Sequence, residues 1–162
     1  MSRIIYRPIG IIHSPFKDPQ GTPIQPESGK DVEGTVEVNE EFTEGLKDLD
    51  GFSHLILVYH FHLVRGYELQ IIPYMDDRKR GVFATRGPRR PNPIGISVVR
   101  LMGINNNVLR VKDLDIVDGT PLLDVKPHVS GFDAGSAERI GWLENNIRKL
   151  RKTKDDGRFT RN

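Results

Sequence analysis

The chain contains no cysteine among its 162 residues. This absence excludes disulfide bonds, thiolate nucleophiles and sulfur-ligated zinc, and it predicts a cytoplasmic protein. No apolar run approaches the roughly 20 residues that a membrane-spanning helix needs. The N-terminus "MSRIIYRPIG" also lacks the layout of a signal peptide. We therefore expect no membrane segment.

The sequence signatures of the large nucleotide-binding enzyme classes are also missing. There is no Gly-x-x-x-x-Gly-Lys loop, and no Gly-x-Gly-x-x-Gly follows an expected strand. These absences argue against P-loop NTPases, kinases and Rossmann enzymes. Ser97 lies outside any nucleophile-elbow pattern, which disfavours a serine hydrolase.

Positive charge is unevenly distributed, although the net charge is only +2. Residues 148–162 carry seven Lys or Arg against two Asp, so the remaining body is slightly acidic. Residues 78–90 carry six cations and no carboxylate, whereas residues 31–50 carry eight carboxylates. Clustered cations suit a polyanionic partner such as nucleic acid. The alternative is a solvated face with a disordered basic tail.

Short segments with strand patterns dominate the chain, and the turn at residues 105–107 predicts a hairpin. The expected strands cover residues 4–14, 32–38, 53–64, 68–74, 81–85, 96–104, 108–116 and 122–129. A short acidic helix is expected over Asn39–Gly51, because Asn39 is a good cap residue. No long helices separate the strands, which disfavours a doubly wound fold. The sequence therefore predicts a mainly β protein, a small and mostly antiparallel β-barrel.

Only the C-terminal region has a clear helical pattern. Ser136 can cap a helix, and an apolar stripe at helical spacing follows it, formed by Ile140, Leu143, Ile147 and Leu150. We expect a barrel domain over 1–135, a helix over 136–151 packed on the barrel or on a dimer partner, and a basic flexible tail over 152–162.

The most unusual stretch is "TRGPRRPNPIG" (Thr85–Gly95). Each proline fixes its φ near about −65°, so the loop should hold its polar groups in place before a ligand arrives. Arg86, Arg89 and Arg90 offer donors to phosphate or carboxylate. Asn92 lies between two prolines, so its side-chain amide is attached to a conformationally restricted backbone. A solubilising rim turn is the alternative, but the placement of Asn92 favours a site.

Histidines and aspartates form two further candidate clusters. His54, His60 and His62 would share a strand face, and a metal could bind there with His13 or His128 as a further ligand. No carboxylate–histidine motif accompanies them, so we expect no metal. The stretch "DLDIVDGTPLLDVKP" holds several carboxylates: Asp113, Asp115, Asp118 and Asp124. Its simplest interpretation is a surface turn, with Asp124 and Lys126 paired on one strand face.

Together these stretches resemble the TsaA-like or TrmO-like family. The matching pieces lie within residues 8–133 and are "PIGIIHSPF", "QGTPIQP", "FSHLILVYHFH", "GVFATRGPRRPNPIGISVVRL" and "DGTPLLDVKPHV". The resemblance implies a short form of a homodimeric β-barrel enzyme, without the extra C-terminal domain of long bacterial members. Its cofactor would be S-adenosylmethionine, and its substrate N6 of the threonylcarbamoyl-modified adenosine beside the tRNA anticodon.

The resemblance also implies roles for individual residues. The cofactor would contact Pro23, Ile24, Gln25, Phe61, His62, Arg86, Ile96, Asp118, Gly119, Thr120 and Pro121. Beyond what the resemblance implies, we hypothesise that the Asn92 side-chain oxygen, or a nearby backbone carbonyl in "RPNP", accepts the N6–H in catalysis, with Asp124 as the alternative. Arg89, Arg90, Lys126 and the basic tail are our candidates for contacts with tRNA phosphates. The chain departs from the family pattern at Ile24, Gly87 and His128, where many relatives have arginine, serine and tyrosine. A non-catalytic barrel that binds the cofactor or RNA is the alternative.

Overall fold

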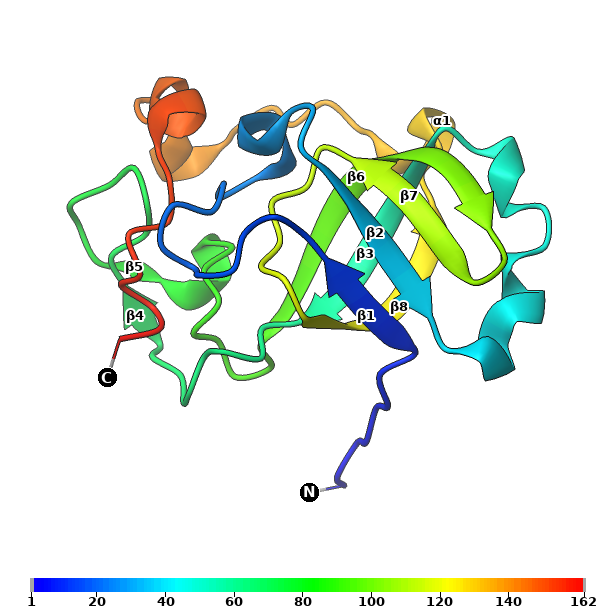
Figure 1. Ribbon diagram of the computed structural model, residues 1–162. Helices are drawn as coiled ribbons and strands as arrows, with labels where there is room; N and C mark the ends of the chain where they lie inside the picture. Colours follow the sequence, from blue (N-terminus) through cyan, green and yellow to red (C-terminus); the bar gives the residue numbers. More distant parts are fainter. Residues whose placement is uncertain (1, 162) are drawn as a thin grey trace.

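A closed barrel of six antiparallel strands forms the centre of the computed structural model, which describes residues 2–161 (Figure 1). Neighbouring strands follow the order β1-β2-β7-β6-β3-β8 around the barrel. The strands are β1 (Gly10–His13), β2 (Glu33–Val38), β3 (His54–His60), β6 (Ile94–Asn105), β7 (Val108–Lys112) and β8 (Thr120–Pro127). The predicted mainly β, antiparallel barrel is confirmed.

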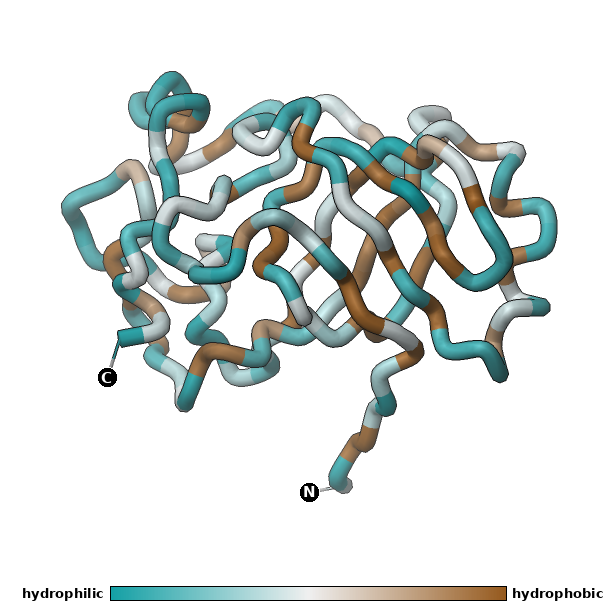
Figure 2. The backbone as a smooth tube through the Cα atoms, in the orientation of Figure 1, coloured by the Kyte–Doolittle hydropathy of each residue, from teal (hydrophilic) through white to brown (hydrophobic). Residues whose placement is uncertain are grey.

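Alternating side chains fill the barrel interior. On β3, Leu55, Leu57 and Tyr59 are buried, while the residues between them are partly exposed. The other strands contribute apolar residues in the same way, as Figure 2 shows along the barrel strands. The largest fully buried side chains of this core include Ile12, Val36, Val99, Leu109, Val111, Leu114 and Leu122. This period of two is the pattern expected of strands with one inward face.

The hairpin between β6 and β7 follows the prediction closely. The two strands pair antiparallel up to Asn105 and Val108, and Asn106 has a φ of 54°. Asparagine is one of the residues that tolerate this left-handed conformation, which explains the turn at this position.

The acidic segment after β2 forms two 3-10 helices, η2 (Glu40–Leu46) and η3 (Leu49–Gly51). Asp48 separates them with a φ of 66°, so one continuous helix cannot form. Asn39 precedes η2 as expected, but its side chain makes no capping hydrogen bond. The remaining short elements are η1 (Pro26–Gly29) and α1 (Ser130–Asp133). No helix within residues 2–161 is both long and apolar enough to cross a membrane.

The strand expected over residues 81–85 is mostly wrong. Only Arg80–Gly81 (β5) pairs as a strand, with Gln70–Ile71 (β4). A 3-10 helix, η4 (Val82–Ala84), follows directly. The Thr85 hydroxyl donates to the Val82 carbonyl oxygen at 2.8 Å, which closes this turn locally and leaves Phe83 exposed.

The continuous helix predicted from Ser136 is also wrong. Residues 134–140 contain no helix, and two 3-10 helices follow, η5 (Gly141–Leu143) and η6 (Ile147–Lys152). Gly141 has a φ of 59°, which interrupts the α conformation. The apolar stripe nevertheless packs on the body of the chain, since Leu143, Ile147 and Leu150 line a cavity described below.

The basic tail, which we expected to be flexible, packs against the body of the chain. Lys154 forms an isolated antiparallel bridge with Pro23, and Asp155 exchanges backbone hydrogen bonds with Gly21 and Thr22. Phe159 is only 5% exposed and packs with Ile71, Val82 and Tyr74. Figure 1 shows this segment running beside β4 and β5, at the side of the barrel.

Candidate functional site

A cavity of about 860 Å³ lies where the loops and the C-terminal segment meet one end of the barrel. The size falls within the roughly 300–1,000 Å³ of small-molecule sites. Six parts of the chain build its wall beside the barrel strands: residues 19–27, 61–64, 73–75, 83–90, 115–117 and 142–160. The proline-rich segment that separates β1 from β2 is therefore an ordered wall of the cavity.

Most of the residues implied as cofactor contacts line this cavity. They are Pro23, Ile24, Gln25, Phe61, His62, Arg86, Ile96 and Thr120. The remaining three, Asp118, Gly119 and Pro121, are not among the lining residues. Asp118 instead ties together the turn before β8, where it accepts hydrogen bonds from the Ser14 amide at 3.0 Å and from Lys17 Nζ at 2.7 Å.

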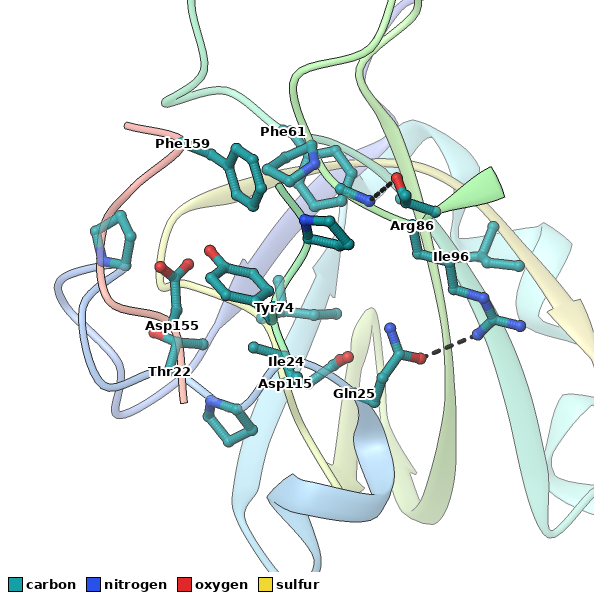
Figure 3. Close-up of a pocket in the computed structure, with 18 of the residues that line it drawn as sticks. Thr22, Ile24, Gln25, Phe61, Tyr74, Arg86, Ile96, Asp115, Asp155 and Phe159 are labelled. Atoms are coloured by element: carbon teal, nitrogen blue, oxygen red, sulfur yellow. Dashed lines mark hydrogen bonds between the residues drawn. The ribbon is translucent and has the colours of Figure 1, made fainter. Parts of the chain in front are cut away.

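The polar contact between Arg86 and Gln25 joins two walls of the cavity. An Arg86 guanidinium nitrogen donates to Gln25 Oε1 at 3.0 Å (Figure 3). Nearby, Tyr59 and Phe61 stack edge to face with ring centroids 5.5 Å apart. A Cβ at Gly95 would overlap both rings. This explains why a glycine follows the proline-rich loop: the aromatic wall packs directly on the backbone of β6.

Arg89 and Arg90 hold the proline-rich loop and the tail in place. Arg89 donates to the Phe159 carbonyl at 2.9 Å, to Glu68 at 2.8 Å and to the Arg161 carbonyl at 2.6 Å. Arg90 donates to the Thr85 and Gly87 carbonyls at 3.0 and 3.1 Å. The rigidity predicted for this loop is therefore supported by arginine hydrogen bonds as well as by proline.

The two candidate catalytic residues do not line the cavity. Asn92 is exposed, and in the sequence it stands between Arg90 and Ile94, which both line the cavity. Asp124 lies on β8 and pairs with Lys126 at 2.6 Å, which confirms the ion pair expected from their spacing. The structure therefore places neither residue on the cavity wall.

Asp115 lines the cavity, although the sequence indicated only a surface turn at this position. Its Oδ1 accepts a hydrogen bond from Ser97 Oγ at 2.6 Å, and Ser97 Oγ lies 3.0 Å from the Tyr59 hydroxyl. Desolvation raises the pKa of Asp115 to about 7, against smaller lowering effects of Ser97 and the Arg86 charge. Acids with strongly raised pKa values in cavities are candidate functional groups.

A second polar cluster faces the cavity from the tail. The side chains of Tyr74 and Asp155 approach one another, with Phe159 beside them (Figure 3). The Tyr74 and Phe159 rings stack edge to face at 5.1 Å. Burial raises the pKa of both Tyr74 and Asp155. The tail therefore contributes a polar wall as well as an apolar one.

The histidines are divided between the two ends of β3. His54 lies near His128, with ring centroids 6.3 Å apart, and the backbone amide of His128 donates to the His54 carbonyl. His62 follows the other end of the strand, and desolvation lowers its pKa. Among residues 2–161, no group of three His, Asp or Glu side chains is arranged to hold a metal.

The fold and the cavity define a small β-barrel protein with a cavity of ligand-site size at one end of the barrel. Residues 11–134 match the family model described as the tRNA-methyltransferase O N-terminal domain. The chain belongs to this family.

Proteins from archaea and bacteria are similar to this chain. A probable S-adenosyl-L-methionine-binding protein of Pyrococcus abyssi is 63% identical over 156 residues, with 96% of this chain and 85% of the relative covered. The tRNA (adenine(37)-N6)-methyltransferase of Escherichia coli is 34% identical over 139 residues, with 80% of this chain covered. The match spans only 59% of that enzyme.

The fold is also similar to a solved structure. The crystal structure of TrmO from Pseudomonas aeruginosa superposes with a TM-score of 0.71 at 38% identity. The superposition covers 88% of this chain and 63% of the Pseudomonas chain.

Proposed function

We propose that this protein is an S-adenosylmethionine-dependent methyltransferase that modifies N6 of adenosine 37 in tRNA, as the name of the Escherichia coli relative describes. The observation that carries the proposal is the cavity, which collects most of the implied cofactor contacts from separate parts of the chain. A tRNA substrate would also place the protein in the cytoplasm. The competing proposal is a barrel that binds the cofactor or RNA without turnover.

The cavity residues fit the parts of S-adenosylmethionine. Ile96 and the apolar wall around it suit the adenine ring, while Phe61 offers an aromatic face to the sulfonium. Arg86, steadied by Gln25, is a donor for the methionine carboxylate. When bound, the cofactor supplies an electrophilic methyl group. The role of the chain is then to orient the acceptor nitrogen in line with that methyl group and to exclude water.

Asn92 is our candidate for orienting the acceptor. The N6 lone pair of adenosine is delocalised into the ring, so an oxygen that accepts the N6–H would help to localise it. Asn92 is exposed and close in sequence to Ile94, which lines the cavity, so an unstacked base could reach it. Asp124 is the alternative acceptor, although its pairing with Lys126 makes it the weaker candidate.

Asn92→Ala is expected to lower turnover by about 100-fold and to change cofactor affinity little, because the amide acts on the acceptor. Mass spectrometry of nucleosides from unmethylated tRNA measures turnover, and titration calorimetry measures affinity. Asn105→Ala, at the opposite end of β6, is the matched control. Equal losses of turnover and affinity would contradict the role of Asn92. Cofactor binding by the wild type without any methylated adenosine would favour the non-catalytic barrel.

Lys126 and the basic tail are our candidates for tRNA phosphate contacts. The Lys126 side chain is 62% exposed, and several tail cations are exposed with it. Arg89 and Arg90 were expected in the same role, but their guanidinium groups donate to the loop, to Glu68 and to the tail. We therefore propose that these arginines act on RNA binding chiefly by holding the loop. Phosphate contacts would make tRNA affinity fall steeply with salt.

We also propose that the protein is a homodimer. Three hydrophobic residues of β6 have exposed side chains: Ile94, Ile96 and Met102. Ile94 and Ile96 also line the cavity, so a partner there would close its mouth. Sedimentation equilibrium at micromolar concentration should give twice the 18.4 kDa chain mass. Met102→Glu should shift the mass toward the monomer, and a monomeric wild type would contradict the proposal.

A further inference from the structure

The backbone around Asp115 is fixed by its two neighbours. Leu114 is fully buried and Ile116 is 2% exposed, and both pack in the barrel core. The Ser14 hydroxyl donates to the Ile116 carbonyl at 2.6 Å, which adds a second anchor. Asp115 itself lines the cavity, so the packing of its two neighbours fixes the position from which its carboxyl group meets a ligand.

Two hydroxyl groups orient the Asp115 carboxyl group from the barrel side. Ser97 Oγ donates to Asp115 Oδ1, so the single Ser97 proton is used there. The Tyr59 hydroxyl must then donate to Ser97 Oγ, 3.0 Å away. The chain of donors from Tyr59 to Ser97 to Asp115 stabilises a negative charge on Asp115 without neutralising it.

Asp115 lacks a cationic partner, unlike Glu27, which meets Arg151 at 3.1 Å. The third carboxylate of the cavity, Asp155, also forms no ion pair with another described residue, but it accepts the Gly157 amide and lies beside Tyr74. Within residues 2–161, no Lys, Arg or His nitrogen lies within ion-pair distance of Asp115. A desolvated carboxylate of this kind gains most from a cation that a ligand brings.

We propose that Asp115 binds the α-ammonium group of the methionine part of S-adenosylmethionine, while Arg86 binds the adjacent α-carboxylate. The inference rests on the proposed function, because it assigns a subsite for the same cofactor. Arg86 and Asp115 both line the same cavity. An anion and a cation on neighbouring walls match the two charges of an amino acid, which lie on one carbon atom. The pair would recognise an amino acid end rather than a nucleoside alone.

Binding of an ammonium group requires Asp115 to be ionised, so cofactor affinity should fall as the pH drops below about 7. The groups facing Asp115 are Tyr59, Ser97 and Arg86, and Tyr59 stays neutral because burial raises its pKa. Other titratable groups lining the cavity are Glu27, His62, Tyr74, Arg90 and Asp155. An Asp115 variant keeps all of these groups. The difference in the pH dependence of affinity between wild type and that variant is therefore the contribution of Asp115.

Three ligands titrated into wild type and Asp115→Asn test the proposal. S-adenosylmethionine and S-adenosylhomocysteine both carry the ammonium group, whereas 5′-methylthioadenosine lacks the amino acid. We expect Asp115→Asn to weaken the first two by about 10- to 100-fold, the loss typical of a hydrogen bond to a charged group, and to leave the third unchanged. Asp113→Asn is the matched control, because it lies in the same loop, outside the cavity, at a φ of 68° that asparagine tolerates.

Each other result overturns the assignment. Loss for S-adenosylmethionine alone would mean that Asp115 faces the sulfonium, and equal loss for all three ligands would mean that it only shapes the cavity. The wild type also supports a test without any variant: its affinity should fall below about pH 7 for the two amino acid ligands and not for 5′-methylthioadenosine. Failure of wild type to bind any of the three would instead refute the proposed function itself.

Discussion

Phe159→Ala is expected to lower the free energy of unfolding by about 3–5 kcal/mol, one of the largest effects of any single change outside the barrel core. Phe159 is 5% exposed and fills a small satellite core with Ile71, Val82 and Tyr74. For a chain of this length the loss corresponds to roughly 2–4 °C in melting temperature per kcal/mol. Affinity for S-adenosylmethionine should fall as well, because Phe159 lines the cavity.

Thermal unfolding and titration calorimetry measure the two effects of Phe159→Ala. Phe132→Ala is the matched control, since Phe132 is 77% exposed on α1 and makes no part of the cavity. It should unfold at nearly the wild-type temperature and bind the cofactor normally. If both variants behave like wild type, the tail does not pack on the body in solution, and the flexible tail suggested by its composition is correct.

Phe159 lines the cavity although it lies outside the part of the chain that matches the family model. The family match ends at residue 134, yet residues 142–160 supply one wall of the cavity. The Trp142 indole donates to the Ala84 carbonyl at 2.8 Å, and the Ser28 hydroxyl donates to the Leu150 carbonyl at 3.0 Å. The C-terminal segment is therefore anchored at Trp142 to η4 and at Leu150 to η1.

The barrel could be predicted because its signal is local. Alternating apolar residues and turn residues define each strand, and Asn106 adopts the positive φ that the three asparagines suggested. The C-terminal segment could not be predicted in the same way. The stripe from Ile140 to Leu150 has helical spacing, but Gly141 breaks the helix, and the Trp142 and Lys149 side chains bond to the body instead. Tertiary contacts override local propensity there.

The residues of the candidate site likewise fall into those that the sequence indicated and those that it did not. Gln25, Phe61 and Arg86 were implied by a family resemblance, and all three line the cavity. Asp115 was visible only as one carboxylate in a stretch whose pattern indicated a surface turn. Its role depends on the burial of Leu114 and Ile116 and on its contact with Ser97, which lies 18 positions earlier in the sequence. Such long-range contacts leave no pattern in a single sequence.

Asp115→Asn is expected to stabilise the free protein at pH 8 while it weakens cofactor binding. An acid whose pKa rises from 3.8 to about 7 on folding binds more protons in the folded state, so the wild type loses stability as the pH rises through that interval. A tenfold difference in proton affinity between the folded and unfolded states corresponds to about 1.4 kcal/mol. The asparagine variant should therefore gain up to about 4 kcal/mol above pH 7, less where water in the cavity screens the charge. Near pH 4 the two proteins should be equally stable.

Denaturant unfolding across this pH range, with and without saturating S-adenosylmethionine, tests the stability effect. Without cofactor, Asp115→Asn should be the more stable protein at pH 8. Saturating cofactor should narrow this difference by about 1.4–2.7 kcal/mol, the equivalent of a 10- to 100-fold difference in affinity, because ligand that binds only the folded state adds stability in proportion to the logarithm of its affinity. Asp113→Asn should follow the wild type throughout. A variant that is less stable than wild type at pH 8 without cofactor would show that the Asp115 charge is already compensated in the free protein. A stability difference that cofactor narrows is the expected signature of a carboxylate kept desolvated for a cation that only the ligand supplies, at a cost in stability that the free protein bears.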